Sequence, residues 1–240
     1  MNRWSTGPDP IPPLGGNAHV WAVELDDSGF DGFKWHGRIS PEEQARAVRF
    51  KFDKDQRRYI IAHAALRDVL AAYTNAEAAS LQFNDGPNGK PKLAPPFDAS
   101  GIEFNLSHSH ELALVAVNQT GEVGVDIEFA KPDFDFLEVA NRFFTKREVA
   151  ALRALPSEFQ SQAFYKCWTG KEAFLKAKGT GLSGELDEVK ITLSGEHVQI
   201  KANVAGWSLA ELDPPEGYEA ALVTECRPME ISCFRWKAAW

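Results

Sequence analysis

One short segment of this chain, Gly124-Val125-Asp126-Ile127-Glu128, alternates between apolar and acidic residues. Side chains of a β-strand alternate between its two faces, so Asp126 and Glu128 would share one face while Val125 and Ile127 pack on the other. The pattern therefore predicts a half-buried strand that holds two carboxylates side by side.

A second segment, Trp168-Thr169-Gly170-Lys171-Glu172-Ala173-Phe174-Leu175-Lys176, has the spacing of a helix. Trp168, Glu172 and Lys176 are four residues apart and would line one side of that helix. If the helix packs against the acidic strand, three carboxylates converge beside a lysine. That arrangement suits a divalent cation that holds a phosphorylated substrate. The alternative is a plain surface ion pair between Glu172 and Lys176, worth only about 0.3–0.5 kcal/mol.

Elsewhere the hydrophobic pattern changes repeatedly between strand-like and helix-like spacing. Ser40-Pro41-Glu42-Glu43 and Thr145-Lys146-Arg147-Glu148 are capping boxes, which predict helix starts. The pattern predicts strands near residues 19–25, 102–107, 112–117, 124–128, 198–202 and 218–224, and helices near 54–73, 149–155 and 158–178. This order of strand, helices, strands, helices, strands favours the α+β class.

Each half of the chain holds one long predicted helix and a few strands. We therefore expect an N-terminal α+β half over residues 18–118 and a C-terminal half, with the carboxylates, over residues 119–240. Residues 1–17 contain closely spaced Pro and Gly and are predicted to form a flexible arm. The strands at 112–117 and 124–128 are joined by a short turn and are expected to pair as an antiparallel hairpin.

Charge and composition exclude some classes of function. A net charge of −8 over 240 residues argues against non-specific nucleic-acid binding, and no apolar run is long enough to span a membrane. The three cysteines are odd in number and lack ligand spacing, which favours a cytoplasmic protein. Between Arg46 and Arg58, six basic residues oppose two acidic ones, which suits an anionic ligand such as a phosphate or, alternatively, a solvated helix face.

Several motifs, taken in order, resemble those of the Sfp-type 4′-phosphopantetheinyl transferases. They are Ser40-Pro41-Glu42, Gly89-Lys90-Pro91, Phe104-Asn105-Leu106-Ser107-His108-Ser109, Gly124-Val125-Asp126-Ile127-Glu128, Arg142-Phe143-Phe144-Thr145 and Trp168-x-x-Lys171-Glu172-Ala173-x-x-Lys176-Ala177-x-Gly179-x-Gly181. The resemblance covers about residues 20–225. It implies two similar α+β halves, related by a pseudo-twofold axis, with the active site in the cleft between them.

The resemblance also implies an activity. The family transfers the phosphopantetheine arm of coenzyme A to a serine of an apo acyl or peptidyl carrier protein, as holo-[acyl-carrier-protein] synthases do. Adenosine 3′,5′-bisphosphate is released, and Mg²⁺ is required, with Mn²⁺ as a possible substitute. Chain length favours the single-chain form of the family, so we expect a monomer. Neither nucleic acid nor membrane is an expected partner, and the sequence does not identify the carrier.

Site residues follow from the resemblance, position by position. Asp126, Glu128 and Glu172 are expected to hold the metal, and Glu172 is a ligand, the base for the carrier serine, or both. Lys176 is expected to contact phosphate and to neutralise the charge of the leaving group. The expected coenzyme A contacts are Arg46 and Arg58 at the 3′-phosphate, Ser107 and His108 at phosphates, and Lys90 beside the adenosine. Glu43 departs from the family pattern, since relatives carry a basic residue there.

Two functions of other classes remain open at this stage. A catalytically silent coenzyme A-binding module would need the basic residues but not the three carboxylates. A metal-dependent nucleotide hydrolase would need the carboxylates but no coenzyme A contacts and no surface for a carrier.

Overall fold

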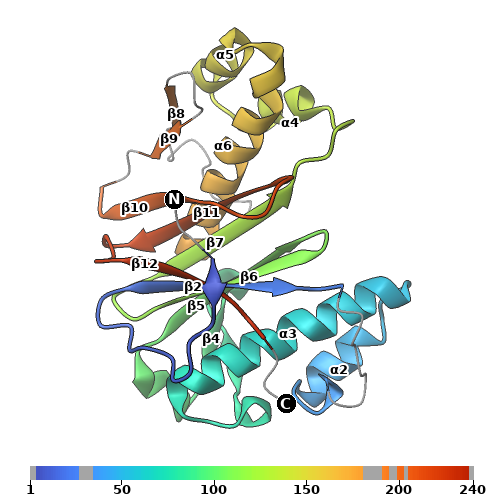
Figure 1. Cartoon of the computed structure of the whole chain (residues 1–240), viewed down its shortest axis with the longest axis vertical. Coiled ribbons are helices and arrows are strands. Elements are labelled where there is room, and N and C mark those ends of the chain that lie inside the picture. The colour runs from blue at the N-terminus through green and yellow to red at the C-terminus, as the bar shows by residue number, and fades with distance from the viewer. Residues whose placement is uncertain (1–3, 27–34, 181–190, 195–198, 203–204, 238–240) are drawn as a thin grey trace.

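The computed structural model describes residues 4–26, 35–180, 191–194, 199–202 and 205–237. The helices in these ranges are α2 (Pro41–Ala47), α3 (Asp53–Thr74), α4 (Phe136–Phe143), α5 (Lys146–Ala154) and α6 (Ser157–Lys178). The strands are β1 (Ser5–Thr6), β2 (Ala18–Glu24), β3 (Phe83–Asp85), β4 (Pro91–Leu93), β5 (Glu103–Ser109), β6 (Leu112–Asn118), β7 (Val123–Phe129), β8 (Ile191–Ser194), β9 (Gln199–Ala202), β10 (Trp207–Leu212), β11 (Tyr218–Glu225) and β12 (Ile231–Arg235). This mixture confirms the α+β class (Figure 1).

The first sheet has the strand order β1-β12-β2-β6-β5, and α3 lies across one of its faces (Figure 1). Its strand β6 is buried on both sides. Ala113 and Val115 pack toward α3, whereas Leu114 and Ala116 pack toward the second sheet. Burial on both faces explains why the sequence from Leu112 to Val117 is apolar throughout instead of alternating.

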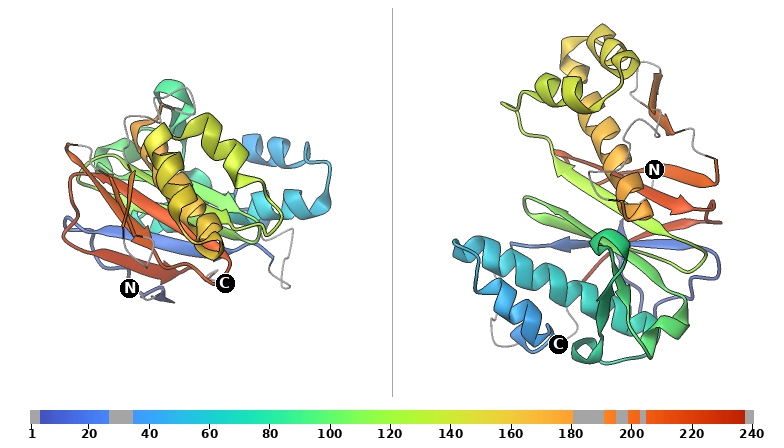
Figure 2. Two further views of the ribbon diagram at one scale, coloured as in Figure 1. Left: turned by 90° about the horizontal axis from the view of Figure 1, so that it is seen from above. Right: turned by 180° about the vertical axis from the view of Figure 1, so that it is seen from behind.

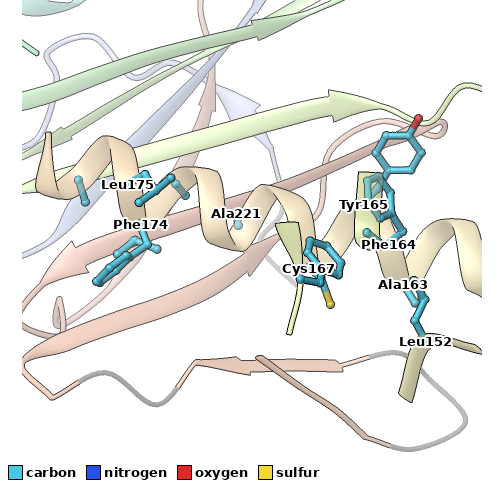
Figure 3. Close-up of a cluster of buried hydrophobic side chains, with 13 residues drawn as sticks. Leu152, Ala163, Phe164, Tyr165, Cys167, Phe174, Leu175 and Ala221 are labelled. Carbon is cyan, nitrogen blue, oxygen red and sulfur yellow. The ribbon is translucent and has the colours of Figure 1, made fainter. Parts of the chain in front are cut away.

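The second sheet has the order β10-β11-β7, and α6 packs on it. Buried side chains of α6 join α4, α5 and β11 in one cluster, which includes Phe164, Cys167 and Phe174 of α6 and Ala221 of β11 (Figure 3). The two sheets pack face to face, with α3 and α6 on opposite outer sides (Figure 2). The predicted role of Val125 and Ile127 is confirmed, because both are buried between the sheets.

The hairpin expected between the strands at 112–117 and 124–128 is wrong. β6 pairs with β2 and β5, whereas β7 pairs with β11. The hairpin is instead β5–β6, whose turn holds His110 in the left-handed region at φ 53°. The chain therefore crosses from the first sheet to the second between β6 and β7.

The two ends of the chain also differ from expectation. The segment predicted to be a flexible arm contains β1, which pairs in parallel with β12, and Leu14 of this segment is buried in the core of the N-terminal half. β12, from the end of the chain, lies between β1 and β2 in the first sheet. The boundary expected after residue 118 therefore does not separate the two sheets.

Local signals predicted the helix ends well. Both capping boxes are formed, at Ser40 with Glu43 and at Thr145 with Glu148. Helix α6 ends at Gly179, whose φ of 67° is left-handed as expected. None of the helices within the described ranges is long and apolar enough to cross a membrane. The pseudo-twofold relation between the halves stays a prediction.

Candidate active site

A glycine brings β7 into direct contact with α6. A β-carbon at Gly124 would lie 2.1 Å from the Ala173 carbonyl oxygen and 2.4 Å from the Ala177 amide nitrogen. No other residue fits there, so the strand and helix backbones approach closely only because this position is glycine. Asp126 and Glu128 follow at alternate positions on the same face of β7, which turns them toward α6.

The structure gathers Asp126, Glu128, Glu172, Lys176 and Ser107 where β5, β7 and α6 meet. Lys176 Nζ lies 2.6 Å from Asp126 Oδ1 and donates to Ser107 Oγ at 2.8 Å. Ser107 Oγ in turn donates to the same Asp126 oxygen at 2.9 Å. In this arrangement Lys176 and Ser107 stabilise Asp126, a contact that the sequence did not predict.

Burial raises the pKa of all three carboxyl groups. The pKa of Asp126 is raised by burial, and the Lys176 ammonium opposes the shift. Burial and the neighbouring charge of Asp126 raise the pKa of Glu128. Glu172 reaches a pKa of about 7, first through burial and then through the charges of Asp126 and Glu128. The three carboxylates thus disfavour one another's charged forms, which a bound cation would reverse.

Two oxygens of this cluster, Asp126 Oδ2 and Glu172 Oε1, are buried and have no hydrogen-bond partner. Leaving such groups unpaired is costly, and a hard divalent cation would satisfy both. The all-oxygen donor set therefore fits Mg²⁺ or Mn²⁺. As arranged here, no group of three or more His, Cys, Asp or Glu side chains among the described residues is placed so that it could hold a metal ion. The ligand roles of Asp126, Glu128 and Glu172 stay predictions.

A cavity of about 250 Å³ lies beside the cluster, between the start of α3 and the end of β5. One arginine, one aspartate and several rings share its lining, which consists of Phe50, Asp55, Arg58, Tyr59, His108 and His110. Burial lowers the pKa of His108, and the charges of Lys176 and Arg58 lower it further. His108 therefore lies between Lys176 of the carboxylate cluster and Arg58 of the cavity lining. Such a lining suits an anionic group attached to a planar ring.

Of the two predicted arginines, Arg58 lines this cavity and Arg46 lies over the Tyr59 ring, and each already has a contact. Arg58 donates to both Asp26 carboxylate oxygens at 2.7 Å, and one of its nitrogens lies 3.5 Å from Glu111. The guanidinium carbon of Arg46 lies 5.7 Å from the centre of the Tyr59 ring. Their role in gripping a phosphate stays a prediction.

Lys90 is not brought to the cavity lining. Its ammonium is buried and donates to Glu122 Oε2 at 2.6 Å, the Val123 carbonyl at 2.9 Å and the Ala177 carbonyl at 3.0 Å. All three protons of the ammonium are used. In this structure Lys90 ties the loop before β4 to β7 and to the end of α6.

Lys171, another position of the helical motif, also points away from the cluster. It is fully buried and pairs with Glu148 of α5 at 3.0 Å. This pair joins α5 to α6 and leaves Glu172 and Lys176 as the motif residues at the site. Gly181, the last position of the motif, lies outside the described residues.

Sequence reasoning missed Tyr59 in the cavity and Ser109, which donates to Glu128 Oε2 at 2.8 Å. Tyr59 looked like one more apolar position of α3, and no local signal distinguished it. Ser109 could have been found, because Ser107 and Ser109 alternate along β5 as Asp126 and Glu128 alternate along β7.

Comparison with known families gives two matches that together span most of the chain. Residues 122–223 match the family described as the 4′-phosphopantetheinyl transferase superfamily. Residues 33–120 match the family described as 4′-phosphopantetheinyl transferase, N-terminal. The carboxylate cluster lies mainly within the first match, and all six residues that line the cavity lie within the second.

Individual relatives agree with these matches. The chain is 37% identical over 222 residues to the 4′-phosphopantetheinyl transferase HetI of Nostoc sp., covering 92% of this chain and 93% of that protein. It is 34% identical over 155 residues to the 4′-phosphopantetheinyl transferase Sfp of Bacillus subtilis, covering 65% of this chain and 66% of that protein. The human L-aminoadipate-semialdehyde dehydrogenase-phosphopantetheinyl transferase is 31% identical over 174 residues, covering 68% of this chain and 55% of that protein. This chain therefore belongs to the 4′-phosphopantetheinyl transferase superfamily.

Proposed function

We propose that this protein transfers the 4′-phosphopantetheine arm of coenzyme A to a serine of an apo carrier protein and releases adenosine 3′,5′-bisphosphate. One observation carries the proposal. Two buried carboxylate oxygens, on Asp126 and Glu172, lack hydrogen-bond partners beside Lys176 and near a cavity that is lined by Arg58 and several rings. A divalent cation would pair with the two carboxylate oxygens, and a polyphosphate with an aromatic base would fit the cation and the cavity.

The cavity would take the nucleotide end of coenzyme A, with Arg58, Arg46 and His108 toward the 3′-phosphate. Asp126, Glu128 and Glu172 would hold Mg²⁺, which would supply positive charge for the pyrophosphate. Lys176 adds a second positive charge beside the reacting phosphate.

In the transfer step, the carrier serine oxygen attacks the β-phosphorus of coenzyme A. The bond from this phosphorus to the bridging oxygen breaks, and its electron pair leaves with the bisphosphate. The serine proton passes to Glu172, whose pKa of about 7 before metal binding suits a base, or to a water beside it. Holding the reactants in line and compensating charge provide most of the rate enhancement.

The finer assignments belong to the same proposal. The activity is of the holo-[acyl-carrier-protein] synthase type, the partner is an acyl or peptidyl carrier protein, and the enzyme acts as a monomer. All three cysteines are free, which agrees with a cytoplasmic protein. Relatives of both bacterial and human origin carry phosphopantetheinyl transferase names, which supports the reaction class.

The test incubates the protein with Mg²⁺, coenzyme A and a panel of apo carriers from fatty acid, polyketide and peptide synthesis. Intact-mass spectrometry then reads the carrier. We expect one phosphopantetheine arm per carrier, at its serine. No mass gain across the panel would refute the proposal. Bisphosphate release without a carrier would favour a hydrolase, and coenzyme A binding without any reaction would favour a silent binding module.

A further inference from the structure

Strand β7 is an edge strand in the described part of its sheet, because β11 pairs with only one of its sides. The other side of β7 faces β5, which belongs to the first sheet. The backbone N–H groups on such an edge need acceptors when the strand is buried. Here β5 supplies those acceptors from its side chains.

Two side chains on one face of β5, four residues apart, accept hydrogen bonds from backbone amides of β7. Asn105 Oδ1 accepts from the Val125 amide at 2.9 Å. Four residues further, Ser109 Oγ accepts from the Phe129 amide at 3.1 Å. These bonds replace the backbone ladder that β5 and β7 do not share, and they fix the register of the two strands.

The same face of β5 also contacts the carboxylates of β7. Ser107 donates to Asp126 Oδ1 at 2.9 Å, and Ser109 donates to Glu128 Oε2 at 2.8 Å. The period of two along β5 therefore matches the period of two along β7. Each carboxylate receives one hydroxyl.

Ser109 is the more constrained of the two hydroxyls. The Phe129 N–H occupies one side of its oxygen, which leaves its own proton directed to Glu128. Glu128 is thus tied, through one hydroxyl, to the backbone of the residue that follows it. This closed arrangement holds the Glu128 side chain in one orientation along β7.

We propose that Ser109 is a positioning residue that orients Glu128 for the divalent cation, with Asn105 anchoring the β7 backbone beneath it. This inference deepens the proposed function, since it assumes a cation at Asp126, Glu128 and Glu172. Removing a group that hydrogen-bonds to a metal ligand commonly lowers metal affinity about 10- to 100-fold.

The test measures Mn²⁺ binding to Ser109→Ala, Ser109→Thr and Ser100→Ala in the presence of coenzyme A and without carrier. Free Mn²⁺ is read by electron paramagnetic resonance. Ser100 is the matched control, because its hydroxyl also donates to one oxygen, of Phe97, and accepts from one amide, of Ile102, but lies before β5 and away from the carboxylates. Urea denaturation of each variant measures the loss of stability.

We expect Ser109→Ala to weaken Mn²⁺ binding about 10-fold, Ser109→Thr to restore most of it, and Ser100→Ala to leave it unchanged at a similar loss of stability. In the transfer assay, Ser109→Ala should need more Mg²⁺ and reach nearly the wild-type kcat at saturation. Equal Mn²⁺ affinity of Ser109→Ala and wild type would overturn the proposal, as would a wild type that binds no Mn²⁺. If Mn²⁺ affinity responds but no carrier is modified, the positioning role holds and the proposed function fails.

Discussion

Lys176 Nζ lies 2.6 Å from Asp126 Oδ1, whereas Asp126 Oδ2 is buried without a hydrogen-bond partner. The protein thus satisfies one oxygen of this carboxylate and leaves the other for a ligand. An amide at this position would keep the size of the side chain but lose its charge.

We therefore expect Asp126→Asn to lower the rate of transfer to an apo carrier about 100-fold or more, together with Mg²⁺ affinity. Calorimetric titration with Mg²⁺ and the carrier mass assay measure the two effects. Asp133→Asn, at an exposed position after β7, serves as the control and should match wild type. Unimpaired transfer by Asp126→Asn would remove the metal site from this cluster.

The raised pKa of Glu172 gives a pH dependence in the metal-free protein. Its pKa of about 7 lies above the unfolded value of 4.5, so the folded state binds this proton more tightly than the unfolded chain does. This contribution to stability is present below pH 4.5 and is lost as the pH rises through 7. Urea denaturation from pH 4.5 to 8 should show a steeper fall for wild type than for Glu172→Gln. Added Mg²⁺ should stabilise wild type more at pH 8 than at pH 5.5, and equal slopes would contradict the assignment.

Lys90 and Lys92 both pair with Glu122 at 2.6 Å, yet their side chains are 6% and 38% exposed. Lys90→Met would leave Glu122 Oε2 and the carbonyl oxygens of Val123 and Ala177 without the Lys90 donor. We expect a loss of about 3–5 kcal/mol in the free energy of unfolding. Lys92→Met should cost at most about 1 kcal/mol, since its pair is solvated. If Lys90 instead serves coenzyme A, Lys90→Met would keep its stability in urea and raise the KM for coenzyme A.

The contact at Gly124 predicts a severe effect of one methyl group. Gly124→Ala would force α6 away from β7, because the three nearest atoms that the β-carbon meets all belong to the helix backbone. The expected cost is about 3 kcal/mol in urea denaturation, with loss of transfer as the carboxylates separate. Gly206→Ala is a useful comparison, since its β-carbon meets nothing within 4 Å and only the left-handed φ of 84° is strained. It should cost about 1 kcal/mol and leave transfer unchanged. Similar effects of the two variants would argue against a tight strand–helix contact.

His108 offers a test of which end of coenzyme A enters the cavity. If it contacts the 3′-phosphate, His108→Ala should raise the KM for coenzyme A about 10-fold and leave the KM for 3′-dephospho-coenzyme A nearly unchanged. Steady-state kinetics with the two substrates gives the comparison. An equal rise for both substrates would place His108 away from the 3′-phosphate.

Local signals in the sequence were sufficient for α2, α3, α5, α6 and the half-buried strand, whereas α4 was not predicted. Ser40 and Thr145 sit three residues before their glutamate partners, so each helix start is encoded within four residues. The alternating residues of the acidic strand and the four-residue spacing in the helix with Glu172 likewise predicted these two elements. Their convergence needed only these two elements to pack together, whereas the contact of Asp126 with Ser107 of β5 was not predicted.

Features that depend on distant partners were not predictable in this way. β7 pairs with β11, about 95 residues further along, whereas the nearby β6 pairs elsewhere, so a short turn wrongly indicated a hairpin. The burial of Lys90 could not be predicted from its Gly-Lys-Pro turn. Its acceptors at Glu122, Val123 and Ala177 are far from it in the sequence. No pattern around the Gly-Lys-Pro turn encodes that burial.

Because β12 lies between β1 and β2, the first sheet cannot be completed until β12 has been synthesised. The N-terminal half must therefore wait, with the edge of β2 unpaired, while the entire C-terminal half is synthesised. Any folding of the N-terminal half as it emerges leaves one edge of β2 unpaired until β12 is available. The first sheet is thus completed only when both halves are present, and a chain shortened before residue 231 would expose the edges of β1 and β2.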